Sequence, residues 1–303
     1  MTAIQFLAEW AIRSSILILG GTLLLWVLRV RDASLRLAAC TLLLCASLAI
    51  PMLTRALPNL PFQAMPKASE TVTSPIGVSA PLPRPAGSVP DSVPSARFDW
   101  MGAVLLAYAA GVLILLGRLA VGLALTLRLL RGSRTTEQSS ERIKILESDR
   151  IGAPVTLGIL RPAILLPADW RAWETEKLDA VLAHERSHIG RRDPAVQLFS
   201  ALHRALLWHS PLSWFLHRRI IRIAEEASDD AAIAVIRDRA LYARFLMDFM
   251  LHGIRGAKLP GVAMARYGLP EKRLNRILDS NALSPGSLAP RIPCSMKSIR
   301  NRA

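Results

Sequence analysis

One short segment of the sequence, residues 178–192, carries two histidines and a glutamate at a spacing that suits metal chemistry. It reads LDAVLAHERSHIGRR and contains an HExxH motif formed by His184, Glu185 and His188. Residues four apart lie on one helix face, so both imidazoles can bind one zinc ion while Glu185 reaches a water molecule on that ion. Zinc lowers the pKa of such a water towards about 7, and a neighbouring carboxylate can take its proton. The motif predicts hydrolytic zinc chemistry with Glu185 as the catalytic base.

A catalytic zinc site has three protein ligands and one open position, so a third ligand is needed. The segment RIAEEASDDAAIAV, residues 222–235, offers Glu225 with Asp229 and, one position later, Glu226 with Asp230. The two acids of each pair are four apart, so one can bind zinc while the other accepts a hydrogen bond from a ligand imidazole. Spacing alone does not choose between the two registers, and an acidic, solvated helix face is the alternative interpretation.

The elements that must position these residues divide into a membrane part and a globular part. Before about residue 130 the apolar residues form three runs, near residues 10–28, 37–53 and 100–127, each long enough to cross a bilayer. After it, the segments ERIKILESD, PVTLGI and AILLP predict a small sheet with a hairpin, and helical periodicity begins near Glu176. Pro194 and Ser210-Pro211 predict further helix starts. We therefore expect a multi-span α-helical membrane part followed by a small, mainly helical α+β zinc metallopeptidase domain.

Basic residues near the ends of the runs predict how the chain is oriented. They gather after the first run and after the third: Arg29, Arg31, Arg36, Arg128, Arg131 and Arg134. Because such clusters mark the cytoplasmic side, we expect a multi-pass protein of the cell (inner) membrane with its amino terminus outside and its catalytic domain in the cytoplasm. A cleaved signal peptide is the alternative for the first run, which ends at arginines rather than at a small-residue cleavage site.

These features divide the chain into five parts. We expect two transmembrane helices in residues 1–53, a Pro/Ser-rich external loop in 54–99, a third transmembrane helix in 100–130, a cytoplasmic zinc metallopeptidase domain in 131–280 and a basic polar tail in 281–303.

Composition narrows the function classes further. The formal net charge of +15 would suit nucleic-acid binding, but basic flanks of membrane spans account for it better, so we expect no direct nucleic-acid binding. Three cysteines without a CxxC pair support neither a disulfide scaffold nor a cysteine metal site. His203, His209 and His217 lie on or near apolar helices with Trp208 and Trp214, and we expect them to be packing or interfacial residues rather than metal ligands. That helical hairpin either lies on the membrane surface or forms an ordinary core.

Four sequence blocks resemble the cytoplasmic metallopeptidase domain of the BlaR/MecR family, membrane antirepressors that sense beta-lactams. The blocks are PVTLGILRPAILLPADW, AVLAHERSHIGRRD, HSPLSW and EEASDDAAIAV, in the family's order across roughly residues 154–235. The three inferred spans also fit the family's amino-terminal membrane part. Matching the family's E-x-A-C-D motif implies that Glu225 is the third zinc ligand and Asp229 a supporting acid, while Ser228 stands where the family often has Cys.

The resemblance implies an integral membrane zinc endopeptidase with one Zn²⁺ ion, which cuts a cytoplasmic protein such as a transcriptional repressor, or cuts itself. By analogy with similar metallopeptidases, the hairpin PVTLGILRPAILLP would bind an extended substrate along a sheet edge. The tail SLAPRIPCSMKSIRNRA resembles neither the family's further span nor its external sensor. We therefore expect a sensor-less member, and beta-lactam sensing is not carried over.

Two other functions compete with this one. A membrane signalling or scaffold protein with a non-catalytic zinc site is the first, and Glu185 argues against it because a structural site needs no carboxylate there. An intramembrane protease is the second, but the motif follows a charged stretch rather than lying in an apolar span. The lipid bilayer and a protein substrate are the expected partners, and the sequence does not specify an oligomeric state.

Overall fold

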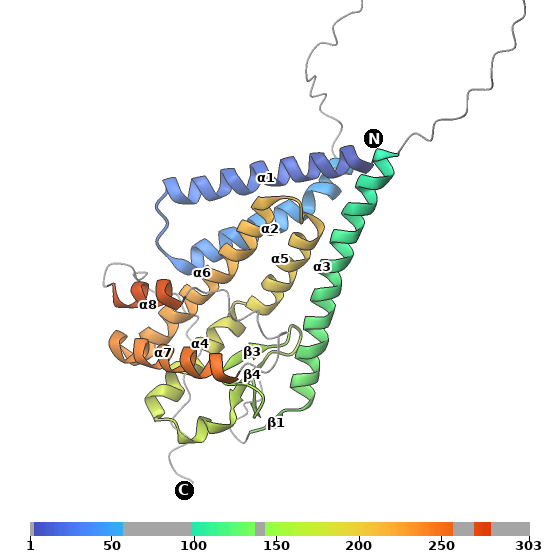
Figure 1. Ribbon diagram of the computed structural model, residues 1–303. Coiled ribbons are helices and arrows are strands. Elements are labelled where there is room, and N and C mark those ends of the chain that lie inside the picture. The colour runs from blue at the N-terminus through green and yellow to red at the C-terminus, as the bar shows by residue number, and fades with distance from the viewer. Residues whose placement is uncertain (1–2, 57–98, 137–142, 257–269, 280–303) are drawn as a thin grey trace, which may run out of the picture.

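The computed structural model describes residues 3–56, 99–136, 143–256 and 270–279 (Figure 1). Nearly all of the predicted external loop and the whole predicted tail lie outside these residues. Three described helices are long and apolar enough to cross a membrane: α1 (Ala3–Val27), α2 (Ala33–Ala56) and α3 (Trp100–Arg131). Many of their Leu, Ile and Val side chains are exposed, as lipid-facing helices require. The chain is a membrane protein, and the expected fold class is confirmed.

A small mixed sheet follows the third span. Its strands are β1 (Arg134–Thr135), β2 (Lys144–Ser148), β3 (Val155–Leu157) and β4 (Ala163–Pro167), in the order β1-β2-β4-β3. β2 and β4 are parallel, and the other two pairings are antiparallel. The predicted hairpin is β3–β4, and it turns at Gly158, whose φ of +93° suits glycine because it has no Cβ. Among the described strands, β3 pairs with β4 alone and therefore forms an edge.

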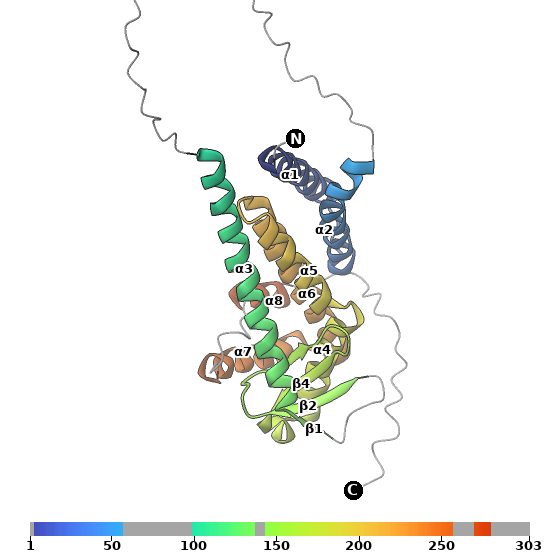
Figure 2. The same ribbon diagram turned by 90° about the vertical axis from the view of Figure 1, so that its right-hand side faces the viewer.

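Helices make up the rest of the described chain after the sheet. They are the 3-10 helix η1 (Ala168–Ala172), α4 (Thr175–Gly190), α5 (Asp193–Leu206), α6 (Pro211–Ile236), α7 (Arg239–Gly256) and α8 (Pro270–Leu278). Pro194 and Pro211 occupy the first turns of α5 and α6, where a missing backbone N–H costs nothing. α6 is central, because it packs against α4, α5 and α7 and also against α1 and α2 (Figures 1 and 2). It therefore connects the membrane part with the sheet-bearing part.

The hairpin formed by α5 and α6 packs among the candidate spans. α5 lies beside α3, and α6 lies beside α2 (Figures 1 and 2). The Trp208 indole N–H, between α5 and α6, donates to the Tyr108 carbonyl of α3 at 3.3 Å. A Cβ placed on Gly111 of α3 would lie 2.4 Å from the Trp208 ring, so only glycine allows this approach. The turn of the hairpin also reaches α1, where the hydroxyl oxygens of Ser15 and Ser210 are 3.3 Å apart.

Two histidines of the hairpin are buried in hydroxyl-lined positions. His203 Nε2 lies 2.8 Å from the Ser47 hydroxyl of α2, and His217 Nδ1 lies 2.8 Å from the Ser200 hydroxyl. Burial lowers the pKa of each imidazole to about 4, because the charged form loses its hydration. Both side chains are therefore neutral packing elements at physiological pH.

Candidate metal centre

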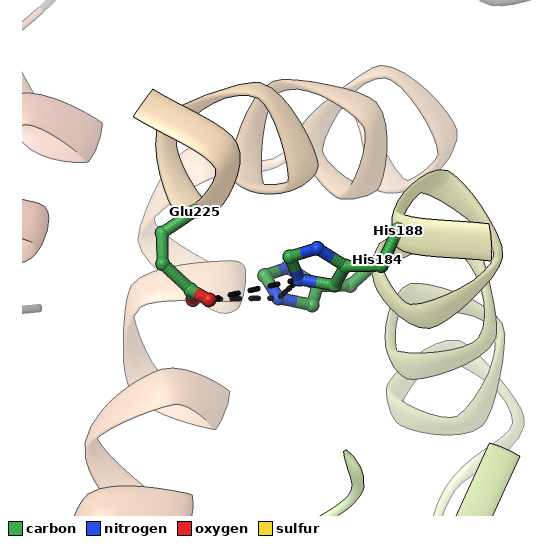
Figure 3. A group of neighbouring side chains, drawn as sticks. All are labelled: His184, His188 and Glu225. Atoms are coloured by element: carbon green, nitrogen blue, oxygen red, sulfur yellow. Dashed lines mark hydrogen bonds and ion pairs between the residues drawn. The ribbon is translucent and has the colours of Figure 1, made fainter. Parts of the chain in front are cut away.

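Two histidines and a glutamate converge between α4 and α6. His184 and His188 project from α4 towards Glu225 on α6 (Figure 3). The two Nε2 atoms are 3.3 Å apart. The Glu225 carboxylate oxygens lie 3.8 Å from His184 Nε2 and 3.7 Å from His188 Nε2. All three side chains are at least 86% buried, which protects the group from competing solvent.

The geometry and the chemistry of this group fit a metal ion. Ligand atoms about 2.0 Å from a tetrahedral zinc ion are about 3.3 Å apart, and the imidazole pair has this spacing. The carboxylate oxygens lie slightly farther away, within the reach of a small side-chain rotation. His184, His188 and Glu225 could together hold a metal ion, with ligand atoms within 4.8 Å of one another. Three protein donors leave the fourth position that a catalytic zinc ion requires.

The structure separates the two acidic registers that spacing left open. Successive helix residues point about 100° apart, so Glu225 faces α4 while Glu226 faces the membrane part. Glu226 pairs with Arg36 of α2 at 2.7 Å, and Asp230 pairs with Arg276 of α8 at 2.8 Å. The second register therefore holds helices together and stays away from the histidines.

A buried polar network surrounds His184. The imidazole Nδ1 is 3.0 Å from the Tyr242 hydroxyl and 3.4 Å from Asp229, and the same hydroxyl donates to Asp229 at 2.8 Å. Arg273 of α8 bridges Asp229 at 2.6 Å and Glu225 at 2.9 Å. Burial alone would raise the pKa of Asp229, but the charge of Arg273 and the contact with His184 hold it far below its usual range. Asp229 is therefore an anion at every physiological pH.

His188 has its own supporting carboxylate, which the sequence did not single out. Its Nδ1 lies 2.7 Å from Asp193 at the start of α5. Burial alone would lower the pKa of His188, but the Asp193 hydrogen bond and the charge of Glu225 outweigh it, so the pKa is raised. Arg191 donates to Asp193 and to the Ser228 hydroxyl, both at 2.6 Å. Ser228 therefore contacts His188 only indirectly, through Arg191 and Asp193. The sequence feature that could have indicated this role is the acidic residue at the start of the helix that follows HExxH.

The carboxylate of Glu185 is tied to the edge strand of the sheet. It accepts a hydrogen bond of 2.7 Å from the Thr156 hydroxyl of β3, and Glu185 is only 7% exposed. The HExxH motif identifies Glu185, but no sequence pattern identifies its partner Thr156, because the contact joins segments 29 residues apart. The side chain is therefore fixed beside the two histidines and next to β3, which is an edge strand among the described strands.

Three candidate spans, a mixed sheet and an HExxH helix facing a glutamate define a membrane protein with a metallopeptidase-type centre. The family model described as BlaR1 peptidase M56 matches residues 6–269, and the chain belongs to this family. It is also similar to the regulatory protein BlaR1 of Bacillus licheniformis, with 30% identity over 105 residues. That similarity covers 35% of this chain and 17% of the relative, so the chain matches a small part of the longer protein.

Proposed function

We propose that this chain is an integral membrane zinc endopeptidase acting on a cytoplasmic protein. The observation that carries the proposal is the convergence of His184, His188 and Glu225 with a fixed carboxylate, Glu185, beside them. Two histidines and one glutamate form a donor set typical of catalytic zinc in peptidases, whereas structural zinc sites are usually closed by four protein ligands. Membership of a peptidase family supports the same function.

The proposed roles follow from the contacts of each side chain. Zinc bound at this centre supplies Lewis acidity and an acidified water molecule. Glu185, oriented by Thr156, is the carboxylate that would accept a proton from the attacking water and pass it to the leaving amine. Asp193 orients the imidazole of His188 for metal binding. Tyr242 and Asp229 do the same for His184. The buried surroundings keep these hydrogen bonds free from competition with water.

The edge of β3 supports a peptide as the substrate. An extended chain that pairs with this strand gains backbone hydrogen bonds without a requirement for particular side chains. Thr156 in the middle of β3 contacts Glu185, so a peptide on this edge would lie beside the proposed catalytic base. Pairing along a strand holds the middle of a chain and so suits an endopeptidase.

The basic ends of the spans support a catalytic part in the cytoplasm and an amino terminus outside. In the cytoplasm, the catalytic part would cleave a regulatory protein, such as a transcriptional repressor, or the chain itself. The similarity to a regulatory protein supports a signalling role.

Zinc content and peptide cleavage, measured on the purified full chain in mild detergent, test this proposal. We expect one zinc per chain in the natural sequence and in Glu185→Gln, and a reduced content in Glu225→Ala. Cleavage of a fluorogenic peptide library should fall about 10²- to 10⁴-fold in Glu185→Gln, because the proton acceptor is lost. The control Glu176→Gln, at the start of the same helix, should change neither quantity.

Two results would contradict the proposal. A folded natural chain that binds no zinc removes the metal centre. A chain that holds zinc but cleaves no peptide, in detergent or in vesicles, favours a signalling or scaffold protein with a non-catalytic site.

A further inference from the structure

A pocket of about 590 Å³ opens beside the α5–α6 turn, and its lining contains none of the proposed metal ligands. Aromatic side chains near the start of α6 line one part, and arginines from the following turns line the other. The residues that matter are Trp208, Trp214, Phe215, Arg218, Arg219 and Arg222. This pocket has no role in the proposed peptide hydrolysis.

The pocket changes from apolar to cationic along α6. Trp214, Arg218 and Arg222 follow one another at four-residue intervals and therefore share a helix face. At a rise of about 1.5 Å per residue, the aromatic end and Arg222 are about 12 Å apart along the axis. A ligand that fills the pocket must be apolar at one end and anionic at the other.

The cationic end lacks an internal counter-charge. No Asp or Glu lines the pocket in the part of the chain that the structure describes. The Arg219 Nε is buried without a hydrogen-bond partner, while Arg218 and Arg222 are exposed. Three arginines line this end of the pocket, and their planar guanidinium forks match the oxygens of a phosphate group. These arginines therefore favour a ligand with an anionic phosphate group.

The aromatic end of the pocket lies against the membrane part. Trp208 donates to the carbonyl of Tyr108 and contacts Gly111, both within the candidate span α3. Along α6, the arginines lie between this contact and Glu225, the proposed metal ligand. The pocket therefore borders a candidate membrane span, and its arginines lie farther from this contact along α6.

We infer that this pocket binds an anionic phospholipid, with Arg218, Arg219 and Arg222 around the headgroup phosphate and the aromatic side chains against the acyl chains. The combination of charge, aromatic lining and contact with a candidate span favours a lipid over a free phosphate. The inference does not depend on peptidase activity.

Fluorescence anisotropy with a labelled phosphatidylglycerol tests the inference on the full chain in mild detergent. The natural chain should bind this lipid at least tenfold more tightly than a phosphatidylcholine with the same label and chains. In Arg218→Gln/Arg222→Gln, the affinity should fall about 25-fold, from about fivefold for each basic residue near an anionic lipid. The control Arg237→Gln/Arg244→Gln loses the same charge from exposed positions outside the pocket and should bind normally.

Three outcomes would overturn the inference. Equal affinity for the two lipids shows that the headgroup charge is not recognised. An equal loss in the control variant shows that net charge alone attracts the lipid. Displacement of the lipid by millimolar inorganic phosphate identifies a free-phosphate site.

If the double glutamine variant fails to fold, Arg218→Lys/Arg222→Lys replaces it. The lysines keep the charge and lose the planar fork, and an unchanged lipid preference would then contradict phosphate recognition by the guanidinium groups.

Discussion

Replacing Asp193 by asparagine tests whether the carboxylate behind His188 strengthens metal binding. The change keeps the size of the side chain and removes its charge. In the structure, Asp193 is 2% exposed, His188 is 7% exposed, and the contact between them is 2.7 Å long. A hydrogen bond to a charged group in such a place contributes about 1.5–3 kcal/mol. At about 1.4 kcal/mol for each factor of ten, we expect zinc affinity to fall about 10- to 100-fold, as is typical when the partner of a ligand imidazole is lost.

The measurement is a zinc titration against a competing chelator at pH 8, where protons compete least with the metal. The pKa of His188 is raised by its surroundings, so a lower pH would mix proton competition with metal affinity. Asp230→Asn is the matched control, because Asp230 is a carboxylate of α6 that pairs with Arg276 away from the histidines. A zinc affinity of Asp193→Asn within twofold of the natural value, or an equal fall in the control, would refute the reasoning.

Three further predictions concern stability, and thermal unfolding of the chain in detergent measures each. Gly111→Ala should destabilise the chain by about 1–3 kcal/mol, because the added methyl meets an indole ring at 2.4 Å, whereas Gly117→Ala meets nothing within 4 Å and should be neutral. His203 has a folded-state pKa of about 4, so the unfolded chain takes up the proton first as the pH falls. The contribution of neutral His203 to stability is therefore present above about pH 6.5, and the free energy of unfolding should fall by about 2 kcal/mol at pH 5. His203→Gln should remove this part of the acid sensitivity. Arg273→Gln leaves a buried carboxylate of α6 without its cation and should cost about 3–5 kcal/mol, against little change for the exposed Lys272→Gln. A melting temperature equal to that of the natural chain would contradict the expectations for Gly111→Ala and Arg273→Gln. An equal fall in melting temperature between pH 7 and pH 5 in the natural chain and in His203→Gln would contradict the second expectation.

Features that depend on local spacing could be predicted from the sequence. The helix periodicity that brings His184 and His188 to one face is fixed by the backbone, whatever the rest of the fold does. Pro194 and Pro211 mark helix starts for a similarly local reason. The β3–β4 hairpin could be predicted because a turn residue separates two short apolar segments. The length of the apolar runs likewise predicted three candidate membrane helices.

Features that join distant segments could not be predicted in the same way. Thr156 and Glu185 are 29 residues apart, and Arg273 and Asp229 are 44 apart. Such contacts depend on how whole helices and strands pack, and no periodic pattern in the chain encodes them. Spacing alone did not distinguish Glu225 from Glu226. The family resemblance pointed to Glu225, and in the structure the neighbours of α6 separate the two registers.

The ion pair between Arg36 and Glu226 has a mechanical consequence for the metal centre. Glu226 directly follows the proposed ligand Glu225, so α2 holds α6 at one angular position through the adjacent residue. A side-chain tip about 6 Å from a helix axis moves about 0.2 Å when the helix rotates by about 2°. Metal–ligand distances tolerate deviations of about 0.2 Å. The ion pair with α2 therefore opposes rotation of α6, and only a few degrees of such rotation are compatible with a bound metal ion.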